Sequence, residues 1–417
     1  MRLLRLQLFD YRNFHRLDLS LGPGASLFIG ANAQGKTNLL ESVYLLATTK
    51  ELRADTEAQV IRWQAVEDVL PARAPEAKPP LADRRAGPVA RVVGEAEAAE
   101  GRLKLEVAIV GREGANGLVA SKTAKVNGIP KRLSEVVGRM AAVLFTAADI
   151  DLVSGAPSTR RRHIDITLSQ VDRGYVPVRS RFERVLGQRN HLLKRIREGL
   201  ARSDELAFWD AELARDGGYL FAARATALSE LAVLAAEAHA SLAPAEELRL
   251  EYRPRLEGQA PDTLSDAAVA AAAYADALRR GVARDIAAGM TIHGPHRDDI
   301  AFFLNGMSAS GFVSRAQQRT IALALRLAEA RLLRSRRGES PLLLLDDILS
   351  EMDAGRRRSV IEAVSAYDQL LVTATDLDRF PREFLDRAAV FSVAAGAVAT
   401  LPSHALASGG TGETQSP

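Results

Sequence analysis

A glycine-bracketed loop near the start of the chain combines residue types that bind phosphate groups. Residues 30–37 read Gly-Ala-Asn-Ala-Gln-Gly-Lys-Thr, which fits the phosphate-loop pattern GxxxxGK[ST] at every fixed position. The glycines let backbone N–H groups surround a β-phosphate, Lys36 can reach the β- and γ-phosphates, and Thr37 can bind Mg²⁺. The sequence therefore predicts a site for a nucleoside triphosphate and Mg²⁺. The predicted nucleotide-binding residues are Gly30, Ala31, Asn32, Ala33, Gln34, Gly35, Lys36, Thr37 and Asn38.

The segments around this loop favour a ligand site over the alternative, a glycine-rich turn without a ligand. The apolar run at 26–29 is typical of a buried strand, and residues 37–47 place their apolar side chains at helical spacing. The order strand, loop, helix puts the loop at a helix N-terminus, where the helix dipole favours a bound anion.

A second run of residues could supply the carboxylates that hydrolysis of a nucleoside triphosphate needs. Residues 342–347 read Leu-Leu-Leu-Leu-Asp-Asp, an apolar strand of the kind that is covered on both faces, followed by two carboxylates. As a Walker B strand it would place Asp346 on Mg²⁺ through water, and Asp347 as the catalytic group that orients or deprotonates the attacking water. The alternative is a core strand that ends in a turn.

The distance along the chain between these motifs separates classes of nucleotide-binding protein. Thr37 and Asp346 are 309 positions apart (346 minus 37), whereas small GTPases and nucleoside kinases close their sites within a much shorter stretch. A large insertion must therefore divide the sheet, as in the ATP-binding-cassette heads of chromosome-maintenance ATPases.

That arrangement directs attention to three further segments. Residues Ser314, Arg315, Ala316 and Gln317 precede a helical stretch and resemble the cassette signature S-x-G-Q, with alanine in place of glycine. Asp353 ends a Ser-Glu-Met-Asp stretch that resembles a D-loop. Asp149 follows a predicted strand at the place where cassette proteins carry a magnesium-sensing loop, so it is a third candidate for the metal site.

Taken together, these motifs resemble those of the RecF family. The matching stretches are 9–14, 30–46, 143–165, 291–299, 312–327 and 342–353, which span nearly the whole chain. The most specific are Gly-Ala-Pro-Ser-Thr-Arg-Arg at 155–161 and Gly-Pro-His-Arg-Asp-Asp at 294–299. Two features depart from the family pattern, Ala316 and an expanded proline-rich stretch at 71–88.

The resemblance implies a function. A protein of this family is expected to bind ATP and Mg²⁺, to bind double-stranded, gapped or junction DNA when ATP is bound, and to hydrolyse ATP weakly with stimulation by DNA. ATP on one subunit would be capped by the signature serine of another, giving an ATP-dependent homodimer. The implied partners are RecR, RecO through RecR, and RecA indirectly, in the cytoplasm.

A basic segment offers candidates for contacts to DNA phosphates. From residue 155 to residue 200 there are 11 Lys or Arg residues against four acids. The chosen candidates are Arg160, Arg161, Arg162 and Arg184. The alternative is a solvated helix face.

The predicted fold class is α/β, an ABC-type P-loop ATPase head with a mixed sheet and an inserted compact α-helical lobe. The head would comprise residues 1–165 and 291–401, the helical lobe 166–290, and a disordered tail 402–417. A mobile insertion is predicted at about 70–100, and helix interruptions at Gly187, Gly199 and Gly217-Gly218.

Composition narrows the remaining classes. The chain has no cysteine, which excludes disulfides, thiolate metal sites and cysteine nucleophiles, and no apolar run long enough to suggest a membrane span. Its formal charge of +3 says little about partners. Two other functions stay open: an SMC-like chromosome-organising ATPase, for which no long heptad pattern is present, and a small-molecule phosphotransferase, which the wide motif spacing disfavours.

Overall fold

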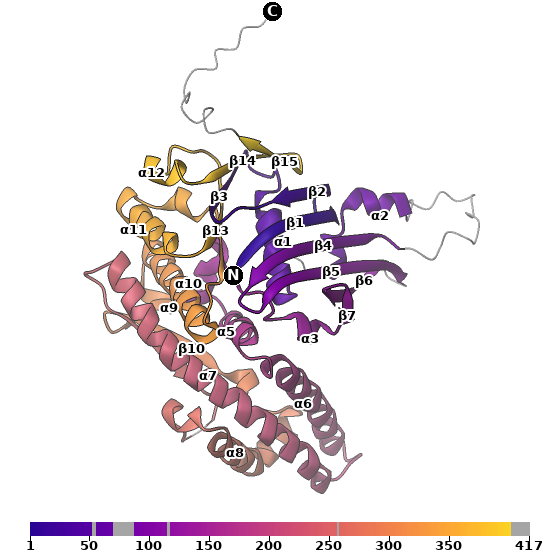
Figure 1. The fold of residues 1–417 in the computed structure, drawn as a ribbon. Helices are drawn as coiled ribbons and strands as arrows, with labels where there is room; N and C mark the ends of the chain where they lie inside the picture. Colours follow the sequence, from indigo (N-terminus) through magenta and orange to yellow (C-terminus); the bar gives the residue numbers. More distant parts are fainter. Residues whose placement is uncertain (52–55, 70–86, 115–116, 257, 402–417) are drawn as a thin grey trace, which may run out of the picture. The chain divides into compact units, whose positions relative to one another are not determined.

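The structure is a computed structural model that describes residues 1–51, 56–69, 87–114, 117–256 and 258–401 (Figure 1). Its contacts divide the chain into two compact units, one formed by Met1–Thr146 with Glu339–Pro417 and the other by Ala147–Gly338. The second unit is wider than the 166–290 lobe expected from the sequence. The reason is that helices outside that range pack against one another within this unit, namely α4 (Ile150–Ser154), α5 (Pro157–Val171) and α10 (Arg315–Arg337).

A mixed six-stranded sheet forms the centre of unit 1. Its strand order is β15-β14-β3-β13-β12-β8, with parallel pairing everywhere except between β14 and β15. The apolar run at 342–345 is fully buried in β12, as its composition predicts for a strand covered on both faces. The strands are β3 (Gly24–Ile29), β8 (Ala142–Phe145), β12 (Leu342–Asp346), β13 (Gln369–Ala374), β14 (Ala389–Ala394) and β15 (Ala397–Leu401).

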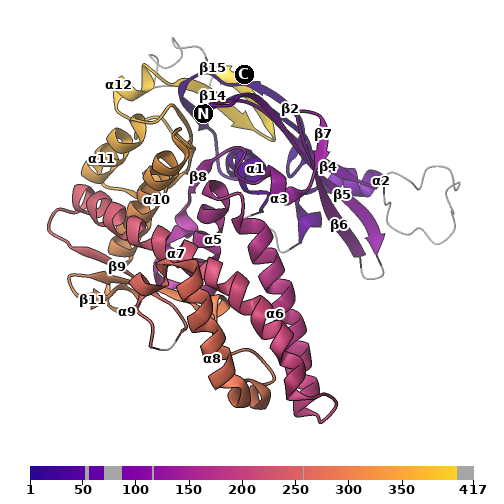
Figure 2. The ribbon, with the colours of Figure 1, turned by 60° about the horizontal axis from the view of Figure 1, so that its bottom comes forward.

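A second, antiparallel sheet of unit 1 has the order β2-β1-β4-β5-β6-β7. Helix α1 (Lys36–Thr48) contacts strands of both sheets, and Figure 2 shows it on the inner side of the curved antiparallel sheet. The strands are β1 (Arg2–Tyr11), β2 (Phe14–Ser20), β4 (Val89–Ala98), β5 (Gly101–Gly114), β6 (Gly117–Val126) and β7 (Ile129–Lys131). The remaining helices of the unit are α2 (Trp63–Val69), α3 (Leu133–Val136), α11 (Ala354–Ser365) and α12 (Arg382–Leu385).

Strand β4 corrects one expectation. The predicted insertion at about 70–100 cannot extend over residues 89–98, because these pair with β1 on one side and β5 on the other. Residues 70–86 and the predicted tail at 402–417 lie outside the described residues.

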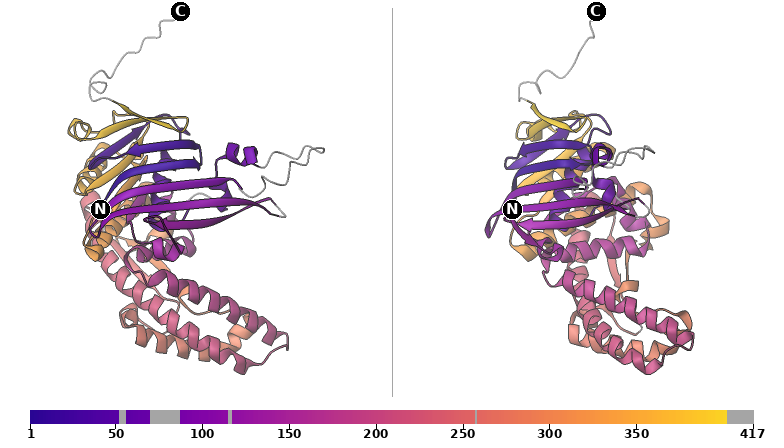
Figure 3. Two further views of the ribbon diagram at one scale, coloured as in Figure 1. Left: turned by 45° about the vertical axis from the view of Figure 1, so that its right-hand side comes forward. Right: turned by 90° about the vertical axis from the view of Figure 1, so that its right-hand side faces the viewer.

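Unit 2 is built mainly of helices. Figure 3 shows α6 and α7 side by side, and α8 also packs on α7. A small antiparallel sheet, β11-β10-β9, was not predicted. The helices are α4 (Ile150–Ser154), α5 (Pro157–Val171), α6 (Tyr175–Arg197), α7 (Leu206–Leu242), α8 (Ala267–Ala288), α9 (Ala309–Phe312) and α10 (Arg315–Arg337), and the strands are β9 (Leu248–Arg253), β10 (Asp299–Leu304) and β11 (Met307–Ser308).

The glycines predicted to interrupt helices include three that do not. Gly187 lies inside α6, and Gly217 and Gly218 lie inside the 37-residue helix α7. A Cβ on Gly217 would come within 2.5 Å of the Tyr274 ring, and one on Gly218 within 2.6 Å of Ala271 on α8. These two glycines therefore allow close helix packing, which offsets their poor helix propensity.

The segment Ser203–Leu242 is long and apolar enough to cross a membrane by length and composition alone. Half of its most apolar window is buried inside the protein, and α7 packs against α6, α8 and α10. It also carries Asp216 and Arg224, both buried and both ion-paired. These contacts are those of a core helix of unit 2.

Candidate functional site

The phosphate loop joins β3 to α1 and depends on two glycines. A Cβ on Gly30 would come within 2.3 Å of the Val393 carbonyl oxygen, and one on Gly35, where φ is 112°, within 2.4 Å of the Asn13 side chain. Neither position can therefore accept another residue without a shift of its neighbours. The first turn of α1 contains no acidic residue, so its positive end is left to a bound phosphate.

Lys36 lies across this loop. It is only 6% exposed, and its Nζ donates to the carbonyl oxygens of Gly30 at 2.5 Å and Ala31 at 2.9 Å. Burial lowers the pKa of Lys36, while the nearby carboxylates of Asp347 and Asp346 oppose that shift. The ammonium group is thus held over the loop, beside the Walker B carboxylates.

Asn13 was not predicted as part of the site, although it lies in one of the matching stretches. Its Nδ2 donates to the carbonyl oxygen of Gln34 at 2.8 Å, and its Oδ1 accepts from Asn38 Nδ2 at 2.8 Å. The turn after β14 supports the loop from another side, since the Ala395 N–H donates to Gln34 Oε1 at 2.7 Å. The loop is therefore held in shape by neighbouring elements of unit 1.

The two ends of the predicted site meet. Thr37 Oγ1 lies 2.8 Å and 2.9 Å from the two carboxylate oxygens of Asp346. Thr373, at the end of the neighbouring strand β13, also donates to Asp346 Oδ1 at 2.9 Å. Sequence reasoning missed Thr373; its position after the apolar run of β13 was the available signal.

Asp347 follows β12 in the left-handed region, with φ at 51°. Its backbone N–H donates to Thr373 Oγ1 at 3.0 Å, and its carbonyl oxygen accepts from Ser350 Oγ at 2.7 Å. Non-glycine residues with positive φ are uncommon in proteins, and those that occur cluster at functional sites. The backbone is thus fixed on both sides of the predicted catalytic carboxylate.

The oxygen donors at this point fit Mg²⁺. A threonine hydroxyl and a carboxylate are hard ligands of the type that Mg²⁺ prefers, and they are adjacent at the N-terminus of α1. When bound there, the ion would neutralise charge on the β- and γ-phosphates. Thr37 and Asp346 are the residues that would hold it.

In unit 2 the signature segment forms the start of α10. Ser314 is exposed and caps the helix: its Oγ accepts from the Gln317 N–H at 3.3 Å, and its N–H donates to Gln317 Oε1 at 2.9 Å. Arg315 and Ala316 are also exposed in this first turn. The segment therefore presents the capping serine and the first turn of α10 to solvent.

Glycine at the third position of the signature could serve for a left-handed backbone, which an alanine adopts only with strain, or for close approach of a ligand. Ala316 lies within α10 and is not among the residues with positive φ. Close approach of a ligand backbone or phosphate is the reason for glycine that is still compatible with this geometry.

The D-loop segment is held by arginines. Arg357 Nη2 donates to the Met352 carbonyl oxygen at 2.8 Å, and Arg379 Nη1 donates to that of Ser350 at 2.8 Å. Asp353 is exposed and caps α11, accepting from the Arg356 N–H at 2.9 Å. That hydrogen bond lowers the pKa of Asp353.

Asp149 pairs with an arginine side chain of α10. Its Oδ1 accepts from Arg326 Nη2 on α10 at 2.6 Å. Arg326 also pairs with Glu329 at 2.7 Å, so the aspartate belongs to a buried ionic network of unit 2. This contact gives Asp149 a structural partner, and its assignment to a metal site stays a prediction.

The basic residues between 155 and 200 do not form one positively charged face, although the sequence has 11 Lys or Arg residues there against four acids. Arg189 is fully buried between Asp210 and Asp285, each 2.6 Å away. Arg160 is 7% exposed, and its Nε and Nη2 donate to Asp299 at 2.7 and 3.0 Å. We therefore expect Arg160 to have a structural role rather than to contact DNA.

The other three DNA-binding candidates differ in exposure. Arg161 is half-buried, and its Nη1 donates to the Asp298 carbonyl oxygen at 2.6 Å. Arg162 and Arg184 are exposed on α5 and α6. These positions are compatible with contacts to DNA phosphates.

Comparison with known proteins shows the family of the chain. A family model described as the RecF/RecN/SMC N terminal domain matches residues 2–383. The DNA replication and repair protein RecF of Roseiflexus castenholzii is 40% identical over 407 residues, covering 95% of this chain and 99% of that protein. The same protein of Geobacillus kaustophilus is 35% identical, covering 97% and 100%.

A solved structure is also similar. It is described as the recombination mediator protein RecF-ATP in the RecFOR pathway, and it covers 96% of this chain and 98% of its own. The TM-score is 0.79 and the sequence identity 26%. This likeness extends over both units of the chain.

Proposed function

Because the chain belongs to the RecF family of DNA replication and repair proteins, we propose that it is an ATP-dependent DNA-binding protein of recombinational repair and replication restart. The observation that carries this proposal is the contact between Thr37 and Asp346, 309 positions apart, at the mouth of a preformed phosphate loop. The fold is that of an ABC-type ATPase head with an inserted helical lobe. ATP is accordingly its nucleotide, and it works in the cytoplasm.

The nucleotide cycle follows from the placement of the groups. Lys36 and the N-terminus of α1 bind the phosphates, and Asp347 orients the attacking water and accepts its proton. Ser314 of a second copy caps the γ-phosphate, so ATP stabilises a homodimer. Weak, DNA-stimulated hydrolysis removes that cap and releases the dimer.

The partners follow from the family. The dimer binds double-stranded and gapped or junction DNA, and it cooperates with RecR, with RecO through RecR, and indirectly with RecA. The supporting observation in this chain is the exposed signature turn at Ser314, which is accessible to a second copy.

Gel filtration with ATP, ADP or no nucleotide, with and without duplex DNA, tests the proposal directly. A dimer should form only with ATP, and DNA should co-elute only with that dimer. A monomer in all conditions, or DNA binding independent of ATP, would contradict the proposed cycle.

Blocking the signature turn should prevent dimerisation. Ser314→Arg adds a bulky cation to the exposed first turn of α10, so ATP-driven dimerisation should weaken more than tenfold while ATP affinity of the monomer is unchanged. Ser314→Ala should weaken dimerisation less than Ser314→Arg, since it removes the same helix cap, worth about 1 kcal/mol, and the contact to the γ-phosphate without adding bulk. Sedimentation with ATP measures both. If Ser314→Arg dimerises like the parent, this turn is not the signature.

DNA binding should weaken steeply with salt, because each phosphate contact releases counterions. Arg162→Ala and Arg184→Ala should each reduce the slope of log affinity against log salt by about 1. Arg160→Ala should leave the slope unchanged but lower the free energy of unfolding by about 1–3 kcal/mol, because it breaks the pair with Asp299. An unchanged slope in the first two variants would remove them from the DNA interface.

A further inference from the structure

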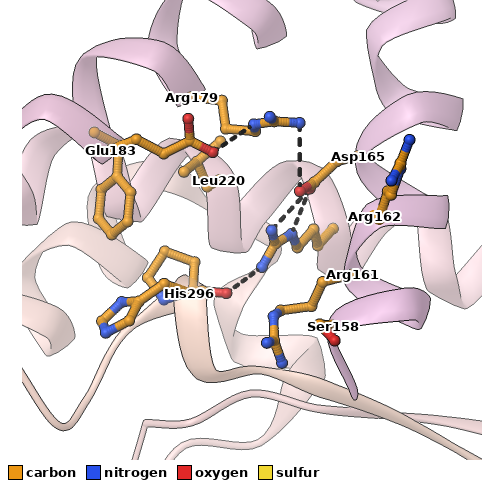
Figure 4. Close-up of a pocket in the computed structure, with 11 residues that line it drawn as sticks. Ser158, Arg161, Arg162, Asp165, Arg179, Glu183, Leu220 and His296 are labelled. Atoms are coloured by element: carbon orange, nitrogen blue, oxygen red, sulfur yellow. Dashed lines mark hydrogen bonds and ion pairs between the residues drawn. The ribbon is translucent and has the colours of Figure 1, made fainter. Parts of the chain in front are cut away.

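The two most specific sequence motifs, 155–161 and 294–299, have no role in the nucleotide site described above. The structure brings them together at one pocket of unit 2 with a volume of about 260 Å³. Ser158 and Arg161 come from the first motif, and Pro295 and His296 from the second. Helices α6 and α7 supply the other walls. Figure 4 shows Ser158 and Arg161 near each other, with Arg179 and Glu183 across the pocket.

A buried ionic network forms the base of this pocket. The Arg224 side chain is 4% exposed, and its Nη2 donates to Asp165 Oδ1 at 2.7 Å while its Nη1 donates to Asp298 Oδ2 at 3.0 Å. Arg179 lies above, 3.6 Å from Asp165 Oδ2 and with its Nε donating to Glu183 at 3.0 Å. These side chains are fixed before any ligand arrives, so little entropy is lost when one binds.

Arg161 differs from these arginines. Its only hydrogen bond in the described part of the chain is the one to the Asp298 main-chain oxygen, and it makes no ion pair there. Burial lowers the pKa of Arg161 and the neighbouring Arg224 lowers it further, while the carboxylates of Asp298, Asp299 and Asp165 oppose this shift. A guanidinium that is partly desolvated beside another cation gains most from an anionic partner.

The lining is cationic overall. Four guanidinium groups, of Arg161, Arg162, Arg179 and Arg224, face two carboxylates, of Asp165 and Glu183, a formal charge of +2. Burial lowers the pKa of His296 to about 4, so its ring is neutral at pH 7, and its Nε2 is taken by the Thr291 carbonyl oxygen. Asp298, behind Arg224, offsets part of this charge. The N-terminus of α5, where Ser158 is the second residue, adds positive potential without an acid in its first turn.

We propose that this pocket binds a phosphomonoester, presented by the phosphorylated end of a DNA strand. The proposal rests on the DNA-binding function proposed above. A phosphomonoester carries a charge of about −1.5 to −2 at pH 7 and an internal phosphodiester carries one, so the monoester gains more from a lining whose formal charge is +2, or +1 with Asp298 counted.

Size and shape favour the end of a strand over its interior. A volume of 260 Å³ is below the roughly 300–1,000 Å³ of pockets for whole small ligands, so it suits a phosphate group and little more. The walls include Phe182, Leu220 and Pro295, whose apolar surface makes the surroundings less polar and strengthens charge-assisted hydrogen bonds. A terminal phosphate is easier to place in a concavity this small than a phosphate inside a duplex backbone, which has nucleotides on both sides.

Binding of end-labelled duplexes tests the proposal, with a non-hydrolysable ATP analogue filling the phosphate loop. The duplexes should be identical except for a 5′-phosphate, a 3′-phosphate or hydroxyl groups at both ends. One phosphorylated duplex should bind about ten- to a hundred-fold more tightly than the hydroxyl-ended one. Inorganic phosphate and AMP, added as competitors, should abolish this preference in the millimolar range.

Two variants should remove the preference. Arg161→Gln deletes the guanidinium without an ion-pair partner. Ser158→Glu places a negative charge in the first turn of α5, where an acid stabilises a helix, so loss of binding cannot be attributed to unfolding. The matched controls are Arg184→Gln and Ser203→Glu, which change the same charges outside the pocket. Arg184→Gln should weaken both duplexes alike, and Ser203→Glu neither.

Four outcomes of these binding measurements distinguish the pocket, its ligand and the proposed function. Tighter binding of a phosphorylated duplex that both pocket variants abolish and both controls retain supports the proposal. Binding of phosphate or AMP that the pocket variants abolish, without any preference among duplexes, supports the phosphomonoester chemistry but assigns it to a free ligand and overturns the DNA end. Equal duplex binding with no effect of phosphate, or a preference that survives Ser158→Glu, overturns the pocket while leaving ATP-dependent DNA binding intact. Failure of every duplex to bind contradicts the proposed function itself.

Discussion

Lys36→Ala is expected to weaken ATP binding at least about 100-fold, because charge-assisted hydrogen bonds contribute roughly 1.5–3 kcal/mol each and Lys36 would supply them to two phosphates. In the structure its Nζ is held by the carbonyl oxygens of Gly30 and Ala31, at the point where the loop surrounds a phosphate. Isothermal titration with ATP and Mg²⁺ measures the loss.

The fold should survive this change. Gly30 is half-exposed and Ala31 exposed, so water can replace the ammonium group at both carbonyl oxygens. Lys36→Met is the matched control for packing, because it keeps most of the length of the side chain and removes the ammonium group with its charge and hydrogen bonds. Both variants should unfold at the denaturant concentration of the parent and lose ATP binding alike. ATP affinity close to that of the parent in either variant would refute the phosphate-loop assignment.

The sequence could predict those parts of the site whose residues are close together along the chain. The phosphate loop and Asp346-Asp347 each sit within one short segment between elements of clear periodicity, so strand, loop and helix follow from neighbouring residues. Asn13 and Thr373 could not be found in this way. Their contacts, to Gln34 and to Asp346, arise only when strands distant in sequence are assembled into sheets.

For a related reason, the number of Lys and Arg residues between 155 and 200 did not show which of them are exposed. Arg189 pairs with Asp285, 96 positions away, and Arg160 with Asp299, 139 positions away, so the acids that neutralise this segment lie outside it. The glycines of α7 show the same limit, because glycine weakens an isolated helix and only the ring of Tyr274 shows why a larger residue does not fit. Local composition predicts the elements here, and tertiary packing decides the roles of individual residues.

Asp347→Asn is expected to slow ATP hydrolysis by about 10²–10⁴-fold, the contribution typical of a positioned general base, while ATP and Mg²⁺ still bind. Asparagine suits this test because it is nearly isosteric and adopts positive φ more readily than other non-glycine residues, and Asp347 has φ at 51°. Alanine would add backbone strain at the same position. The contacts of Thr37 with Asp346, which would hold Mg²⁺, are left in place.

Slow hydrolysis should in turn lengthen the life of the dimer. If hydrolysis is the step that removes ATP from between two copies, the dissociation rate measured after dilution into ADP should fall with the hydrolysis rate, and DNA should stay bound correspondingly longer. Asp386→Asn, an exposed aspartate of the same unit, is the matched control and should change neither rate. Hydrolysis at the parental rate would transfer the catalytic role to another residue. Slow hydrolysis with an unchanged dimer lifetime would separate chemistry from dissociation, since nucleotide exchange would then release the dimer.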